Sequence, residues 1–333
     1  MKRIRILVLI LCAGFVSVAW GQQPQACTTY TPWAEFHRQN MQRWNPCEKV
    51  LNVKSVGSLG LKWSYATGGY VYSSPAVANG VVYVSSGWPS DTLYALNAST
   101  GALLWSDAIV SGSYSNQSSP AVANGVVYVG AHHPGRVCAL NASTGAMLWS
   151  YQAYRDVYSS PAVANGVVYF TSYGGYVYAL NASTGALLWS YFIGGQNQSS
   201  SPAVADGVVY VGEYALNAST GALLWSSTTG AGISSPAVAN GVVYVGSYAL
   251  NASTGALLWS YATGNAVYSS PAVANGVVYI GSDDHKVYAL NAKTGTWLWN
   301  YATGGPVESS PAVANGVVYV GSRDGNVYAF GLQ

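Results

Sequence analysis

Short apolar stretches alternate with turn sequences along most of the chain, and the same arrangement returns about every 40 residues. Each copy begins with Ser-Pro-Ala-Val-Ala and continues through Asn-Gly or Asp-Gly into a β-branched run such as Val-Val-Tyr-Val. After a variable segment come Tyr-Ala-Leu, a turn of the type Asn-Ala-Ser-Thr-Gly, and Ala-Leu-Leu-Trp-Ser in most copies. The prolines of the markers are Pro75, Pro120, Pro161, Pro202, Pro236, Pro271 and Pro311. Units of this kind cannot bury an apolar face alone, so they stack or radiate around a common core.

The pattern within one copy predicts four antiparallel strands and no helix. Proline stands at the start of the first strand, where a missing N–H does least harm. Asn-Gly favours a two-residue type I′ turn, and Asn-Ala-Ser-Thr-Gly offers a glycine for positive φ with short polar side chains that bond the local backbone. Strand alternation then places both turns on one face of the molecule. A four-stranded repeat of this length is typical of a propeller blade.

The tryptophans indicate how the ring closes. Seven closing-strand tryptophans match the seven markers, namely Trp63, Trp105, Trp149, Trp189, Trp225, Trp259 and Trp299. Trp63 precedes the first marker, whereas the last copy ends at Val327-Tyr328-Ala329-Phe330 without a closing strand. We therefore expect Leu61 to Tyr65 to supply the fourth strand of the last blade, giving a seven-bladed, all-β propeller over residues 59–333 whose sheet edges are protected.

Copies four and five are shorter than the others between the second and third strands. Only Gly212-Glu213 and Gly246-Ser247 separate the apolar runs there. Glycine at the first central position of a two-residue loop suits a type II′ turn. We expect both blades to keep four strands, with positive φ at both glycines and a notch in that face of the ring; one continuous strand is the alternative.

The first 21 residues have the pattern of a secretory signal. Lys2, Arg3 and Arg5 precede an apolar run, and Ala19-Trp20-Gly21 supplies small residues for cleavage. The expected location is periplasmic or secreted. A lipoprotein signal at Cys12 is the alternative, but the preceding Leu11 is bulky for that pattern.

Residues 22–58 lack the repeat and form a lead-in segment that we expect to cap the propeller. In an oxidising compartment Cys27 and Cys47 could form a disulfide within it. Cys138 takes a position filled by tyrosine in other copies, which predicts a small buried thiol.

Charge excludes some classes of partner. Once Lys2, Arg3 and Arg5 are removed from the 13 basic residues, 10 remain against 11 acidic ones. This balance, without a basic cluster, argues against a nucleic-acid or anionic-membrane surface. Beyond the signal, no apolar run is long enough to span a bilayer. We expect a monomer.

The segment Ala95-Leu-Asn-Ala-Ser-Thr-Gly-Ala-Leu-Leu-Trp105 resembles the tryptophan-docking motif of pyrroloquinoline-quinone (PQQ) propeller repeats, with asparagine at the usual aspartate position. Near copies follow at 139–149, 179–189, 215–225, 249–259 and 289–299. The resemblance implies a docking role for the tryptophans between neighbouring blades. Quinoprotein dehydrogenases of this family carry PQQ with calcium and often an adjacent cysteine pair. This chain has no such pair, and no catalytic residue of theirs has a matching position here.

Other chemical groups are weaker candidates. His132-His133 and His285 fall in different copies, which argues against a shared metal site, and Asp283 to Lys286 is interpreted as a solvated hairpin tip. We therefore predict no catalytic residue, no metal and no cofactor, PQQ and calcium belonging only to the dehydrogenase alternative.

The connections on the face opposite the two turns differ between copies, and binding residues concentrate on such loops. One residue of each copy stands just before the innermost strand and is expected to ring the mouth of the central channel: Tyr72, Gln117, Tyr158, Ser199, Ile233, Tyr268 and Glu308. The function predicted is a binding or scaffold module for a protein, peptide or small molecule. The alternatives are a PQQ-dependent dehydrogenase or degenerate relative, and an outer-membrane assembly scaffold.

Overall fold

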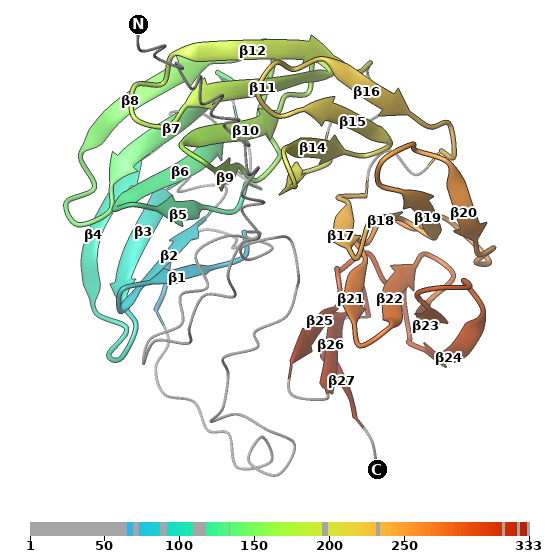
Figure 1. The fold of residues 1–333 in the computed structure, drawn as a ribbon. Helices are drawn as coiled ribbons and strands as arrows, with labels where there is room; N and C mark the ends of the chain where they lie inside the picture. Colours follow the sequence, from blue (N-terminus) through green and yellow to red (C-terminus); the bar gives the residue numbers. More distant parts are fainter. Residues whose placement is uncertain are drawn as a thin grey trace, which may run out of the picture.

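The computed structural model describes residues 65–68, 73–86, 92–108, 118–132, 134–194, 199–230, 234–314, 317–324 and 327–331. Over these residues the chain forms seven antiparallel sheets, six of four strands and a last one of three. We name the sheets blades one to seven in chain order. They follow one another around an arc, with the first strand of each blade inside and the last outside (Figure 1).

The strands of the first four blades have the following bounds. Blade one contains β1 Ala76–Ala78, β2 Val81–Ser85, β3 Thr92–Asn97 and β4 Leu103–Ala108. Blade two contains β5 Ala121–Ala123, β6 Val126–Ala131, β7 Arg136–Asn141 and β8 Met147–Gln152. Blade three contains β9 Ala162–Ala164, β10 Val167–Thr171, β11 Tyr176–Asn181 and β12 Leu187–Phe192. Blade four contains β13 Ala203–Ala205, β14 Val208–Val211, β15 Tyr214–Asn217 and β16 Leu223–Ser226.

The remaining blades repeat this plan. Blade five contains β17 Ala237–Ala239, β18 Val242–Val245, β19 Tyr248–Asn251 and β20 Leu257–Ser260. Blade six contains β21 Ala272–Ala274, β22 Val277–Ser282, β23 Lys286–Asn291 and β24 Trp297–Ala302. Blade seven contains β25 Ala312–Ala314, β26 Val317–Gly321 and β27 Val327–Gly331. The predicted all-β architecture is confirmed.

The two recurring turns of blades one to six have the predicted conformations. In the first hairpin of blade one, Asn79 and Gly80 have φ of 50° and 78°, as a type I′ turn requires, and Ala78 pairs directly with Val81.

In the second turn of blade one, the side-chain oxygen of Asn97 accepts hydrogen bonds from the N–H groups of Ser99 and Thr100. These bonds satisfy backbone N–H groups of the turn that have no partner on a neighbouring strand.

Both turns lie on the same face, as the sequence predicts. The Ala98 N–H of the second turn donates to the Gly80 carbonyl of the first at 2.9 Å. Equivalent bonds recur through blade six. We call this the constant face. The opposite face, which we call the variable face, carries the tip between the second and third strands of each blade and the connection that leads to the next blade.

Blades four and five keep four strands despite their short tips. Gly212 and Gly246 both have φ of 52°, and the flanking strands pair, as in Val211 with Tyr214. The second residue of each tip does not have positive φ, which matches a type II′ turn. The four strands and the positive φ are confirmed, and the continuous-strand alternative is wrong, while the notch in the variable face stays a prediction.

Tryptophans and tyrosines join the successive blades from blade one to blade six. Trp105 Nε1 and the Tyr83 hydroxyl both donate to the Ala142 carbonyl of blade two, at 2.9 and 3.0 Å. The indole also lies on Gly145, where an added Cβ would come within 2.7 Å of the ring. The same arrangement repeats for Trp149, Trp189, Trp225 and Trp259. A large flat ring with one donor thus fills the gap between twisted sheets.

The closure of the ring between blade seven and blade one stays a prediction. Leu61 to Ser64, Trp63 among them, lie outside the described residues, as do Cys27, Cys47 and the whole of 1–58. Tyr65 is described, and its ring lies 5.7 Å from that of Tyr94 in blade one. Between blades two and three, the rings of Tyr151 and Tyr178 lie at the same distance of 5.7 Å from each other. Tyr65 therefore holds the position of a residue from a preceding outer strand.

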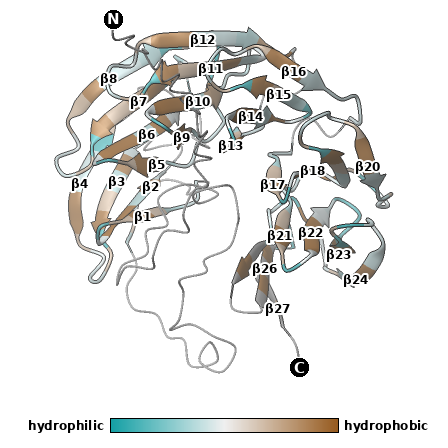
Figure 2. Cartoon of the chain, viewed as in Figure 1, coloured by the Kyte–Doolittle hydropathy of each residue, from teal (hydrophilic) through white to brown (hydrophobic). Residues whose placement is uncertain are grey.

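The core is divided between the blades rather than gathered at one centre. Inner and middle strands bury valine, leucine and alanine between adjacent sheets. Outer strands leave apolar pairs such as Leu103 and Leu104 about half exposed, seen as brown segments on β4, β8 and β20 in Figure 2. Cys138 is fully buried, which confirms the predicted thiol, and burial raises its pKa to about 11.

Candidate functional site

Paired serines fix the start of the innermost strands, where the predicted rim residues stand. The N–H of Ser74 donates to Ser119 Oγ of the next blade at 2.9 Å, and the N–H of Ser119 donates to Ser160 Oγ. The links continue to Ser201, Ser235, Ser270 and Ser310. The sequence analysis missed this ladder, although Ser-Ser-Pro in every copy was its signal.

Four of the seven predicted rim residues fall within the described part of the chain. Tyr158 is half-buried, Ser199 and Tyr268 are exposed, and Glu308 pairs with Arg323 at 2.8 Å. None of these four contacts another of them through a hydrogen bond, ion pair or ring contact. Tyr72, Gln117 and Ile233 lie outside the described residues.

Tyr158 stands in a polar cluster between blades two and three. Its hydroxyl shares a hydrogen bond with Nε2 of His132, whose side chain is 8% exposed. The same nitrogen lies 3.5 Å from Asp156 Oδ2. Burial raises the pKa of Tyr158, and the charge of Asp156 and the ring of Tyr173 add to this shift. Tyr158 therefore keeps its proton at neutral pH.

Aromatic rings extend from this cluster across blade three. Tyr158 meets Tyr173 edge to face at 5.5 Å. Tyr154 lies over Gly174, with Cδ1 only 2.5 Å from where a Cβ of that glycine would be. Tyr154 contacts Tyr176 at 5.9 Å, and Tyr176 contacts Phe192 at 5.0 Å. We call Tyr154, Tyr158, Tyr173, Tyr176 and Phe192 the aromatic strip.

The corresponding positions between blades five and six are polar. Asp284 Oδ2 accepts from the Gly264 N–H at 2.7 Å and from the Tyr288 hydroxyl at 2.5 Å. Burial raises the pKa of Tyr288, and Asp284 raises it further. The segment interpreted as a solvated tip thus holds a carboxylate that fastens two blades together.

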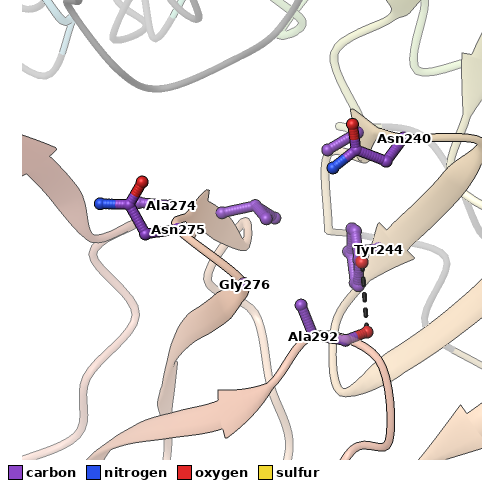
Figure 3. Close-up of a pocket in the computed structure, with 8 residues that line it drawn as sticks. Asn240, Tyr244, Ala274, Asn275, Gly276 and Ala292 are labelled. Carbon is purple, nitrogen blue, oxygen red and sulfur yellow. Dashed lines mark hydrogen bonds between the residues drawn. The ribbon is translucent and has the colours of Figure 1, made fainter.

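The constant face also carries a cavity of about 250 Å³ between blades five and six. Figure 3 shows the Asn240 and Asn275 side chains on opposite sides of it, with the Tyr244 hydroxyl bonded to the Ala292 carbonyl. These asparagines already serve the type I′ turns, and the tyrosine serves blade docking. The fold therefore accounts for this lining.

The described residues do not fit PQQ with calcium. Within them, no three histidine, cysteine, aspartate or glutamate side chains gather closely enough to hold one metal ion. Asp284 and Asp324 are directed at backbone N–H groups of neighbouring connections instead. Glu308 is paired with an arginine. A calcium-dependent quinone needs several free oxygen ligands, which these contacts do not supply.

No helix among the described residues is long and apolar enough to cross a membrane.

Comparison with known proteins identifies the repeat. The profile of the family described as outer membrane protein assembly factor BamB matches residues 58–156, 89–216, 199–249 and 246–333. The dehydrogenase subunit of a quinone alcohol dehydrogenase from Gluconobacter oxydans is 35% identical over 89 residues. A lupanine 17-hydroxylase from a Pseudomonas species is 29% identical over 104 residues. These matches cover 26% and 31% of this chain but only 11% and 15% of the two relatives.

Solved structures share the fold. BamB from Moraxella catarrhalis aligns with a TM-score of 0.67 at 23% identity, over 82% of this chain and 86% of that one. A europium-containing methanol dehydrogenase aligns at 0.72 and 16% identity, over 90% and 85%. A quinohemoprotein alcohol dehydrogenase from Pseudomonas putida aligns at 0.74 and 19% identity, over 90% and 70%. The resemblance to PQQ-type propeller repeats is confirmed, and the chain belongs to the BamB family of β-propellers.

Proposed function

We propose that this protein is an exported, non-catalytic scaffold that binds another polypeptide through its variable face. The observation that carries the proposal is the unequal distribution of side chains between the two faces. Of the charged residues in the described segments, only Asp206 and Lys293 lie in constant-face turns. All the others lie in tips, in connections or at the strand ends beside them.

Most of the exposed aromatic residues lie toward the same face; Trp297, which begins β24 beside a constant-face turn, is the exception. Tyr154, Tyr173 and Tyr268 belong to connections and tips, and each is about half exposed. Exposed aromatic rings next to charged groups are typical of surfaces that recognise proteins. The constant face repeats almost the same small residues from blade to blade, because its turns and docking contacts require them.

Family membership supports the scaffold function, and the sequence supports export. The matching family is described as an outer membrane protein assembly factor. The basic and apolar residues of Met1 to Gly21 are typical of a signal for the periplasm or the exterior. A fold alone does not fix a function, so the dehydrogenase relatives do not outweigh the absence of a fitting ligand set among the described residues.

Site-specific photocrosslinking tests the proposal. In the full exported chain, p-benzoylphenylalanine is placed at Tyr154 or Tyr268 on the variable face, and at Ser99 or Thr184 on the constant face as matched exposed controls. We expect a defined set of protein adducts from the variable-face positions alone. Adducts confined to the constant face would contradict the proposal.

Titration of the purified protein with PQQ and calcium tests the dehydrogenase alternative. Absorbance reports binding, and dye-linked alcohol oxidation reports turnover. We expect neither a saturable spectral change nor oxidation. Tight binding with turnover would replace the scaffold proposal by the enzymatic one.

A further inference from the structure

The outer strands of blades one to six each begin with two large apolar residues that stay about half exposed. The pairs, with side chains 42–53% exposed, are Leu103–Leu104, Met147–Leu148, Leu187–Leu188, Leu223–Leu224, Leu257–Leu258 and Trp297–Leu298. We call these twelve residues the apolar rim. A β-bulge explains why neighbours in sequence are both exposed. In blade one the register shifts between Ala95 and Leu96, so Leu104 is an extra residue and the alternation of the strand is interrupted.

The rim lies at one depth below the constant face. In blade one the pair follows Gly101 of the second turn by two and three residues, which places it within about 10 Å of that face. The register is the same in all six blades, because the first residue of each pair is opposite a leucine of the third strand. Figure 2 shows the rim as brown segments on β4, β8 and β20.

The rim keeps apolar character but not a fixed shape. The first residue of the pair is leucine in four blades, methionine in blade two and tryptophan in blade six. A side chain packed against a fixed neighbour would keep its volume, because close-packed contacts tolerate changes of size poorly. Contact with a fluid apolar phase requires only apolar surface, which all three residue types provide.

The constant-face end of the blades is almost uncharged. In its described turns only Asp206 and Lys293 are charged, and their charges cancel. The other charged residues of the described segments lie toward the variable face. The turns present asparagine, serine and threonine instead. Such a surface gains nothing from an anionic partner but suits a layer of zwitterionic headgroups.

The arrangement of the pairs around the arc favours a lipid surface over a protein partner. Six successive blades carry a pair at the same depth, so a plane laid on the constant face meets all of them (Figure 1). Interfacial membrane proteins bury their apolar residues about 5–10 Å into the boundary between headgroups and acyl chains, which agrees with the depth of the rim. Trp297 adds a residue type that is enriched at this boundary.

We propose that the apolar rim inserts into the interfacial layer of a zwitterionic phospholipid membrane, with the constant-face turns among the headgroups. The variable face then points to water, where a polypeptide partner can reach it. The inference does not depend on the proposed scaffold function, because it uses the opposite ends of the blades.

Co-sedimentation of the full exported chain with phosphatidylcholine vesicles tests the inference. We expect saturable binding that is the same at low and high salt and does not increase when phosphatidylglycerol is added, because the constant-face turns carry no net charge. Replacing Leu187 and Leu188 together by glutamine should weaken binding to the vesicles about tenfold, because one of the six pairs then no longer transfers apolar area from water to lipid.

Phe192→Gln is the matched control variant, because Phe192 is 58% exposed at the variable-face end of the same strand, β12. It should bind vesicles like the parent chain, and circular dichroism checks that both variants are folded. No binding to phosphatidylcholine vesicles, or equal losses for the rim variant and Phe192→Gln, would overturn the inference. Binding that requires phosphatidylglycerol would also overturn it, since charge would then make the contact.

Light scattering of the chain without lipid tests the other occupant of the rim. We expect the same mass for the parent chain and the rim variant. A dimer of the parent chain that the rim variant disrupts would overturn the inference and assign the rim to a second copy. If crosslinking still marks the variable face in any of these cases, the scaffold proposal stands and only the membrane contact is wrong.

Discussion

The junction between blades two and three and the junction between blades five and six share a backbone plan but differ in side chains. In both, a tip N–H donates to the preceding connection, from Tyr173 to the Asp156 carbonyl and from Asp283 to the Ala266 carbonyl. Between blades five and six, a small residue in the connection, Gly264, faces an aspartate in the tip. Between blades two and three the sizes are exchanged, because the connection has Tyr154 and the tip has a glycine.

The exchange changes what the shared tyrosine of the third strand does. The Tyr288 hydroxyl donates to the carboxylate of Asp284. The Tyr178 hydroxyl instead accepts a hydrogen bond from the Tyr154 N–H at 3.1 Å. One junction thus keeps its polar groups for holding blades together, as the junction between blades six and seven does through Asp324 and Gly304. The other junction leaves aromatic rings such as those of Tyr154 and Tyr173 about half exposed.

The largest effect on stability is expected at the third junction, between blades seven and one. Deleting residues 22–66 should lower the melting temperature of the whole propeller by about 10 °C or more, because the predicted closing strand and the Tyr65–Tyr94 contact are lost together. Differential scanning calorimetry gives the transition, and a deletion of 22–58 alone is the control. A monomeric 22–66 deletion with an unchanged transition would show that the last blade does not close in this way.

Exchanging the side chains of one junction for those of the other is the sharpest test of the comparison. Gly174→Asp alone should cost about 1–3 kcal/mol of unfolding free energy, because its Cβ would meet Tyr154 Cδ1 at 2.5 Å and the Tyr154 carbonyl at 2.9 Å. Adding Tyr154→Gly should recover much of this loss by opening the space that Asp284 uses in blade six. Urea denaturation of the two single variants and the double variant measures the coupling. Additive effects would mean that the two junctions are not interchangeable.

Removing a carboxylate from the junction between blades five and six should have a smaller effect on stability. The size of the effect should depend on which of the two neighbouring aspartates is replaced. Asp284→Ala removes the acceptor for Gly264, Lys286 and Tyr288, which should cost about 1–3 kcal/mol. Asp283→Ala is its neighbour and control. Asp283 Oδ1 is buried without a hydrogen-bond partner, so this variant should be neutral or slightly stabilising. Equal losses for both variants in urea denaturation would contradict the assigned role of Asp284.

The smallest effect concerns alkaline pH. Because the pKa of Tyr288 is raised in the folded state, its contribution to stability is complete below the unfolded pKa of about 10 and is lost as pH rises beyond it. Tyr288→Phe should therefore show a shallower fall in melting temperature above about pH 10 than the parent chain. Tyr178→Phe serves as the matched variant at the aromatic junction. A parallel fall for parent chain and Tyr288→Phe would exclude this contribution.

Much of the fold could be predicted from local signals. Asn-Gly with positive φ at both residues, Gly212 and Gly246 in their two-residue turns, and the burial of Cys138 all follow from short segments whose preferences are intrinsic to the backbone or to the strand pattern. The ring of binding residues at the channel mouth stays a prediction. It rests on one position per copy, and in the structure Tyr158 and Glu308 have partners within their own junctions, whereas Tyr268 is exposed.

The sequence by itself determined the repeat, the strands, the turns and the family, because residues close together in the chain specify each of them. Only the tertiary structure decided which connection meets which tip. Tyr154 and Gly174, like Gly264 and Asp284, are 20 residues apart and belong to different blades, so no local pattern links them. The serine ladder likewise joins residues at least 34 apart through backbone groups that the sequence does not distinguish. The strip across blade three exists because packing brings distant aromatic residues into ring contact, Tyr158 with Tyr173 and Tyr176 with both Tyr154 and Phe192.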